Sequence, residues 1–218
     1  MPKIPLRFIL LFAALALLVT AIQFDLLTVA FEKLDLSSDS AYLLFITILG
    51  GSLINLPLFS MKSEPPNLEE LPPQLRELYR NMPYTGKTVV MANVGGCVVP
   101  AAFCFYLLAN HPLNFLYVAL AVAAVTVLSF KTSRSVPGIG MGMPILFAPL
   151  MAALVSVALD PANAAPMAFI SGTLGVLIGA DLLHLKDISK IGTPFASIGG
   201  AGSFDGIFIS GLVAVLLA

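Results

Sequence analysis

The 218-residue chain contains little charge, only two cysteines and only two histidines. Charged residues make up 11% of the sequence and apolar residues 58%, whereas about 25% of a soluble domain is charged. The formal net charge is -1, which excludes the basic surface that nucleic-acid binding requires. The few cysteines and histidines form no zinc-like cluster, and no pattern predicts a bound metal or cofactor.

Long apolar runs take the place of the missing charge. A helix needs about 20 apolar residues to cross the hydrocarbon core of a bilayer. By that rule we expect seven membrane spans, at residues 7–30, 40–60, 88–109, 113–130, 144–159, 163–184 and 196–218. The first run is longer than the roughly 7–15 apolar residues of a signal peptide, so we interpret it as a membrane helix. The sequence therefore predicts an all-α, polytopic transmembrane helix bundle that forms a single domain.

The basic residues predict how the bundle is oriented. Lys33 is the one residue among the 11 lysines and arginines that falls outside the loops of one side. Because cytoplasmic loops carry the excess of Lys and Arg, we expect a cytoplasmic N-terminus, an external C-terminus and a location in the cell (inner) membrane. The largest cytoplasmic loop, 61–87, is rich in proline. The loop 131–144 is rich in glycine and proline, lacks the ending of a P-loop, and is expected to be irregular and re-entrant.

Uncommon polar residues gather in one half of the predicted bundle. At about 1.5 Å of rise per residue, Asn55, Asn93, Asp181 and His184 lie in the cytoplasmic half, and Asp205 lies nearer to mid-depth. A carboxylate at the bilayer centre costs about 3 kcal/mol on insertion scales, so its default interpretation is functional. His184 follows Asp181 by three residues on one helix face, where it either shares a proton with Asp181 or reaches the lipid headgroups.

Helix-breaking residues accompany these polar groups. Pro57 and Pro100 remove hydrogen bonds from the second and third spans, and Gly95-Gly96 loosens the third span further. Broken helices expose backbone groups that bind ions or peptides. The alternative is that these residues only kink the helices or let them pack closely.

Small residues crowd the last two spans. The pairs Gly175/Gly179 and Gly202/Gly206 have the spacing that lets helix backbones touch. On an ideal helix Asp181 lies roughly opposite Gly179. The glycines and the aspartate of the sixth span therefore both face the seventh span only if the helix unwinds near its end.

Two carboxylates from the last two spans predict a specific chemistry. A close pair shares one proton, because both groups cannot ionise easily. Such a pair activates water and protonates a leaving amine, with Asp181 and Asp205 as catalytic residues. The expected substrate-binding residues are Asn55, Asn93, His184, Gly202 and Gly206.

Two alternatives to hydrolysis stay open. The same polar site could carry a proton, a cation or a small solute, or the acids could only hold the helices of a scaffold together. The expected partner is the lipid bilayer, and no nucleic acid is expected. The expected substrate is either a peptide or membrane protein, or else a small ion or solute. The sequence predicts no oligomeric state.

The chain resembles the DUF1614 family of bacterial and archaeal membrane proteins, a family defined without a function. The resemblance covers most of the chain. It is carried by the stretches 54–57, 93–100, 136–140, 172–181 and 197–206.

A weaker resemblance is to the presenilin-type intramembrane aspartyl proteases, which carry a Gly-x-Gly-Asp motif. In those enzymes a sixth span running inward and a seventh running outward each carry one catalytic aspartate on the cytosolic side. The resemblance implies that role for Asp181 and Asp205. Here Asp205 comes two residues later than in the motif, and no later span with a Pro-Ala-Leu motif follows.

Overall fold

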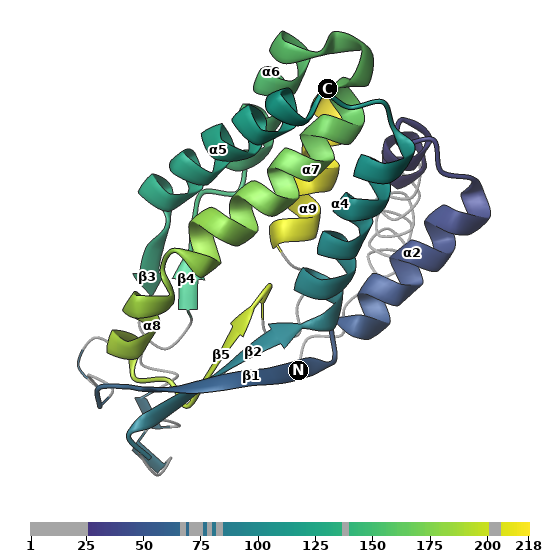
Figure 1. The fold of residues 1–218 in the computed structure, drawn as a ribbon. Helices are drawn as coiled ribbons and strands as arrows, with labels where there is room; N and C mark the ends of the chain where they lie inside the picture. The colour runs from purple at the N-terminus through teal and green to yellow at the C-terminus, as the bar shows by residue number, and fades with distance from the viewer. Residues whose placement is uncertain are drawn as a thin grey trace, which may run out of the picture.

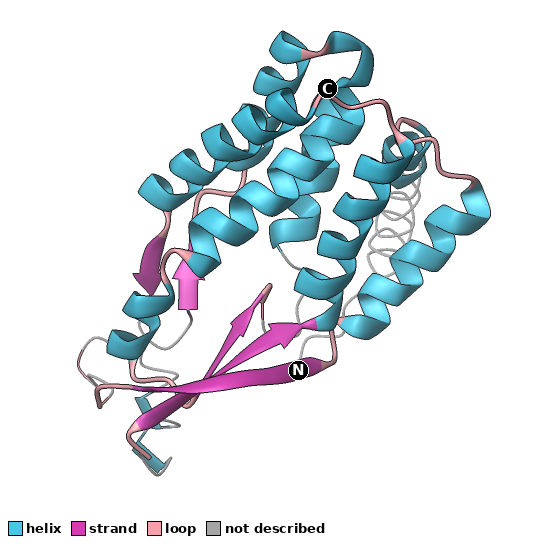
Figure 2. Ribbon diagram, in the orientation of Figure 1, coloured by secondary structure: helices cyan, strands magenta, loops and turns pink. Residues whose placement is uncertain are grey.

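Helices make up most of the structure (Figure 2). The computed structural model describes residues 26–65, 69, 76–77, 80–81, 85–136, 140–200 and 206–218. The α-helices are α2 (Ser38–Gly51), α4 (Val99–Asn110), α5 (Phe115–Thr132), α6 (Phe147–Leu159), α7 (Ala164–Val176), α8 (Leu185–Ile191) and α9 (Gly206–Leu217). Two π-helical segments, η1 (Val94–Val98) and η3 (Leu177–Leu182), and the 3-10 turn η2 (Pro161–Asn163) extend them. Residues 26–32 are also helical, and the rest of the predicted first span lies outside the described residues.

The prediction of an all-helical fold is wrong in three places, where a strand replaces part of an expected span. Strands β1 (Asn55–Lys62), β2 (Lys87–Asn93) and β5 (Phe195–Ile198) form one sheet in the order β1-β2-β5. Strand β1 is antiparallel to β2, and β2 is parallel to β5. The expected spans 40–60, 88–109 and 196–218 each combine one of these strands with a shorter helix.

The local sequence explains these strands. The run Thr88-Val89-Val90 is β-branched and fits a pleated strand better than a helix. Pro57 lies in β1, an edge strand, where a residue without a backbone N–H is tolerated. Pro100 lies in the first turn of α4, directly after the π-helical segment η1, so the residue without a backbone N–H falls where π-helical turns change to α-helical ones.

The loop 131–144 also differs from its prediction. It contains a short antiparallel hairpin of β3 (Arg134–Val136) and β4 (Gly140–Gly142). Residues 137–139 between these strands lie outside the described part of the chain. The predicted loop 61–87 gives its ends to β1 and β2, and most of its interior is likewise not described.

The helices stand side by side, and the β1-β2-β5 sheet closes one end of the bundle (Figure 1). The β3-β4 hairpin and α8 lie at the same end, and the C-terminus lies at the opposite end (Figure 1). Helix α7 is the centre, because it packs against α4, α5, α6 and α9. Its Met167, Phe169 and Ile170 are at most 1% exposed.

Among the described residues, two helices are long and apolar enough to cross a bilayer. They are Phe115–Thr132 and Pro161–Leu182. In the apolar 18-residue stretch of each helix, 22% and 72% respectively is buried inside the protein. Shorter apolar helices of 10–17 residues surround them. Large apolar side chains point away from the bundle, among them Leu43, Phe105 and Leu154, each more than 65% exposed.

Glycine lets α2 and η1 touch through their backbones. A Cβ atom added at Gly95 would lie 2.0 Å from the carbonyl oxygen of Ile48 and 2.4 Å from the backbone nitrogen of Ser52. Across the same contact, a Cβ atom at Gly51 would lie 2.9 Å from the nitrogen of Gly95. Gly51 and Gly95 therefore serve close packing of α2 against η1 at this point.

The glycine stripe of the sixth span packs against α5. A Cβ atom at Gly175 would lie 2.6 Å from Cβ of Val125, and one at Gly179 would lie 2.4 Å from the carbonyl oxygen of Thr126. Helix α9 instead approaches α7 at Gly172, where an added Cβ atom would lie 3.2 Å from Cα of Gly211. The spacing of Gly175 and Gly179 therefore serves contact with α5, which answers the question that the sequence left open.

We expect Gly95→Ala to destabilise the protein, because the new methyl group would overlap backbone atoms that cannot rotate away. Overpacking of this kind costs about 1–3 kcal/mol, which lowers the midpoint of thermal unfolding by about 5 °C in a chain of this size. The control is Gly50→Ala, since no atom lies within 4 Å of its added Cβ. Circular dichroism in detergent measures both midpoints, and equal midpoints would contradict the packing argument.

Candidate functional site

Two of the predicted polar residues meet at the end of the sheet that faces the helices. Asn55 begins β1, Asn93 ends β2, and the two are paired in the strand register. Asn93 Nδ2 donates to Asn55 Oδ1 at 3.2 Å and to the carbonyl oxygen of Ser52 at 2.8 Å. The structure therefore brings together two amides that the sequence assigned to different spans.

Asn93 also begins the π-helical segment that follows the strand. Its Oδ1 accepts a hydrogen bond from the Gly96 N–H at 2.7 Å, which satisfies one of the unpaired donors of a helix start. The side chain is only 1% exposed. Both its oxygen and its nitrogen therefore make hydrogen bonds inside the protein, and these bonds connect the end of α2, the start of β1 and η1.

Asn55 has a different role. Its Oδ1 accepts a second hydrogen bond, from Ser197 Oγ in β5, at 2.6 Å. Within the described part of the chain, Asn55 Nδ2 has no acceptor, so this group is available to donate to a ligand. Sequence reasoning missed Ser197, because its strand was interpreted as the start of a helix. Its position two residues before Gly199-Gly200 was the one local signal of an extended segment.

Asp181 reaches the same region from η3. Its Oδ2 accepts a hydrogen bond from the Gly199 N–H at 2.9 Å. Gly199 and Gly200 have φ angles of +82° and +85°, which favour glycine. A Cβ atom at Gly199 would also lie 2.7 Å from Cβ of Cys97 in η1. The turn after β5 therefore touches both π-helical segments, and it connects Asp181 to the asparagine pair.

Gly179 and Asp181 face different neighbours. Gly179 faces α5 while Asp181 faces the turn after β5, as residues two apart on a helix do, so only the aspartate is directed at the last part of the chain. π-helical turns are rare and occur frequently at functional sites. Here one such segment contains Asp181 and the other follows Asn93 directly.

His184 is turned into the protein. It is 8% exposed, and its Nδ1 lies 3.0 Å from the carbonyl oxygen of Gly179. Its ring packs on Phe130, with 4.7 Å between the centroids. The interpretation that His184 extends to the lipid headgroups therefore does not describe this structure.

The remaining predicted site residues are on the last segment. Gly202 and Asp205 lie outside the described residues, and Gly206 is the first residue of α9. No group of three or more His, Cys, Asp or Glu side chains that could hold a metal ion occurs in the described part of the chain.

A family model described as "Protein of unknown function (DUF1614)" matches residues 49–217. The chain belongs to the DUF1614 family. The matched range of this DUF1614 protein contains Asn55, Asn93, Asp181 and Ser197, which confirms the family predicted from the sequence. No curated protein and no solved structure matches the chain. The weaker resemblance to presenilin-type proteases stays a prediction.

We expect Asn93→Leu to lower stability strongly. The side chains are similar in size, but leucine leaves the Ser52 carbonyl and the Gly96 N–H without partners, and each buried unsatisfied group costs about 1–3 kcal/mol. Asn110→Leu is the matched control, since that exposed amide bonds only to the Tyr106 carbonyl one turn earlier in the same helix. Thermal unfolding in detergent compares the two variants. A similar loss in both would show that Asn93 does not organise the site.

Proposed function

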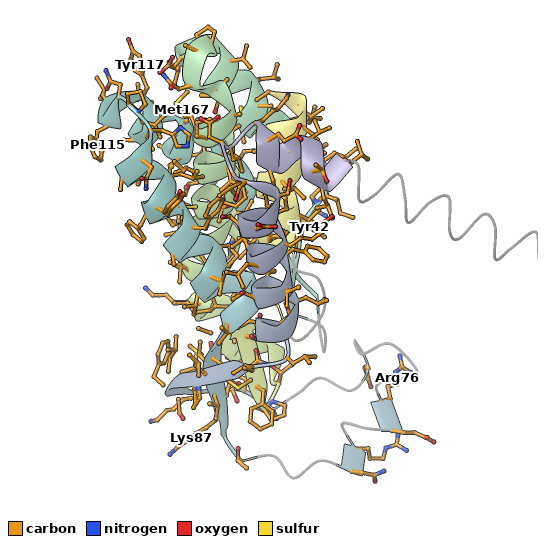
Figure 3. The ribbon with its side chains drawn as sticks, turned by 90° about the vertical axis from the view of Figure 1, so that its right-hand side faces the viewer. Tyr42, Arg76, Lys87, Phe115, Tyr117 and Met167 are labelled. Carbon is orange, nitrogen blue, oxygen red and sulfur yellow. The ribbon has the colours of Figure 1, made fainter. Side chains whose placement is uncertain are left out.

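We propose that this DUF1614 protein is an integral membrane protein with seven crossings, and that its sheet end faces the cytoplasm. Apolar side chains exposed around the bundle support this placement, because contiguous apolar surface of this extent marks a lipid or protein interface. Phe115 and Tyr117 lie at the end of the molecule opposite Lys87 (Figure 3). Tyrosine is enriched at membrane interfaces, and basic residues are enriched on the cytoplasmic side of membrane helices.

In the structure, the basic residues also gather at one end of the molecule. Those on the elements at the sheet end are Lys62, Lys87, Lys131, Arg134, Lys186 and Lys190. Lys33 lies at the other end, where its Nζ donates to the carbonyl oxygen of Val215 near the C-terminus of α9, at 3.3 Å. The positive-inside rule then favours a cytoplasmic sheet end.

Single cysteines test this orientation. In a background with Cys97→Ala and Cys104→Ala, we expect Asn163→Cys to react with a membrane-impermeant maleimide on intact cells. We expect Lys186→Cys to react only after lysis, because it lies at the other end of α7. Labelling of Lys186→Cys on intact cells would reverse the proposed orientation.

We infer that the sheet end carries a di-aspartyl hydrolase site that cleaves peptide bonds of membrane-associated substrates. The observation that supports it is the hydrogen bond from the Gly199 N–H to Asp181. Gly199 is six residues before Asp205 in the chain, a distance that extended chain covers in at most about 20 Å. The turn that binds the Asp181 carboxylate therefore limits how far Asp205 can lie from it.

In the proposed reaction the two carboxyl groups share one proton. The ionised group accepts a proton from a water molecule, whose oxygen attacks the carbonyl carbon of the scissile bond. The protonated group donates its proton to the leaving amine nitrogen as the C–N bond breaks. Asn55 Nδ2, which has no acceptor among the described residues, donates to a carbonyl oxygen of the substrate in this proposal. Stabilisation of this kind is often the largest contribution to acyl-transfer catalysis.

Replacing either acid tests the reaction. We expect Asp181→Asn and Asp205→Asn each to lower cleavage by at least about 100-fold, since one amide removes the shared proton and general acid–base catalysis is worth 10²–10⁴-fold. The assay measures cleavage of a library of single-span peptides by the purified protein in proteoliposomes. Asp187→Asn is the control, because that side chain pairs with Lys190 at 3.0 Å on the surface. Full activity in either site variant would end the hydrolase proposal.

Carriage of a proton or cation is the second candidate. The interrupted helices at η1 and η3 favour it, because half-helix ends and freed backbone groups form ion sites in transporters. In this case pH-driven or solute-driven flux into proteoliposomes would depend on Asp181, and no peptide would be cleaved.

A further inference from the structure

One corner of the sheet end is strongly basic. It is formed by the last turn of α5, by β3 and by α8, and α8 contacts β3 (Figure 1). Lys131, Arg134, Lys186 and Lys190 come from these three elements, and all four are exposed. We call this set the basic corner.

The charge of the basic corner is only partly neutralised. Lys190 Nζ lies 3.0 Å from Asp187 Oδ1. Within the described part of the chain, Lys131, Arg134 and Lys186 have no carboxylate at ion-pair distance. Glu64 also lies nearby, since its backbone N–H donates to the carbonyl oxygen of Ser189 in α8 at 2.8 Å. Among the described residues, four cations thus lie beside these two carboxylates, which leaves this set of side chains with a net positive charge.

Exposed apolar side chains border the same corner. Phe130 precedes Lys131 and is 45% exposed, and Leu183 lies just before α8 and is 52% exposed. Phe130 packs on the ring of His184, which fixes this apolar surface beside the basic residues. A ligand that matches both parts has an anionic head and a hydrocarbon tail.

We propose that the basic corner binds the headgroup of an anionic phospholipid from the cytoplasmic leaflet. Arg134 offers two parallel N–H donors to the phosphate oxygens, and Lys131 and Lys186 add point charges. Basic groups beside the membrane surface attract anionic lipid, and the acyl chains lie along Phe130 and Leu183. The corner is at the end of the apolar helices, so a lipid fits it better than a free phosphate ion does. This inference depends on the proposed membrane placement and not on hydrolysis.

Lipid titration in detergent tests the proposal by native mass spectrometry. Phosphatidylglycerol is the anionic probe, and phosphatidylcholine is the neutral one. We expect the wild-type protein to bind the anionic lipid at least about tenfold more tightly. The triple variant Lys131→Gln/Arg134→Gln/Lys186→Gln should lose about tenfold or more of that affinity, since each charge near the surface contributes appreciably.

The matched control is Lys62→Gln/Arg80→Gln/Lys87→Gln, which removes three charges from the same end of the molecule but outside the basic corner. We expect its affinity to change by less than about threefold. Lys131→Arg/Lys186→Arg keeps the charge and should bind as the wild type does, which separates loss of charge from loss of folding. Asp181→Asn should also bind as the wild type does, so the lipid site and the hydrolase proposal fail separately.

Three results would overturn the proposal. Equal losses in the two triple variants would mean that attraction is spread over the whole end of the molecule. Equal affinity for the two lipids would remove the headgroup preference. Competition by inorganic phosphate as effective as that by the lipid would assign the corner to a free anion.

Discussion

This fold depends on finding partners for the backbone groups at interrupted helices, and the hydrogen bonds of Asn93 do this at one junction. Wherever a helix is interrupted among apolar side chains, its backbone groups lose their partners and must find others within the protein. The interruption between β2 and α4 is satisfied by one amide, which bonds to Ser52, Asn55 and Gly96. That amide joins the end of α2, the start of β1 and the start of η1, so the position of the sheet relative to the bundle follows from it.

A second junction repeats the solution with a charged group. Segment η3 ends α7, and its Asp181 binds the N–H of Gly199 in the turn that leaves β5. The left-handed conformation of Gly199 and its contact with Cys97 leave no room for a side chain there. The turn is therefore held by η1 on one side and by η3 on the other. A rigid turn keeps the Asp181 carboxylate in one position relative to the segment that follows the turn.

Residue type predicted which side chains form the candidate site better than it predicted the secondary structure around them. Asn55, Asn93 and Asp181 stood out because polar groups are rare in apolar runs, and the structure places them around one end of the sheet. The strands did not stand out, because a short apolar strand and a buried helix have no distinguishing periodicity. Pro100 stood out as a helix-breaking residue, but the sequence did not show that it lies where π-helical turns change to α-helical ones.

Contacts between distant segments were also beyond the sequence. Ser197 was not expected to reach Asn55, because the parallel pairing of β2 with β5 sets that approach. The glycine spacing of the sixth span correctly indicated close packing, but it did not identify α5 as the neighbour. The π-helical turns that contain Gly179 and Asp181 have no signature in the sequence that we could recognise.

The parallel pairing of β2 with β5 has a consequence for the order of assembly. Val89 pairs with Phe195, and all the helices from α4 to α8 lie between them in the chain. Contacts between such distant segments form late, since loop closure must precede them. During synthesis the inner edge of β2 stays unpaired until nearly the whole chain has emerged. The Asp181 site is thus completed only when the last segment arrives, and a chain shortened at its C-terminal end would present an open strand to its neighbours.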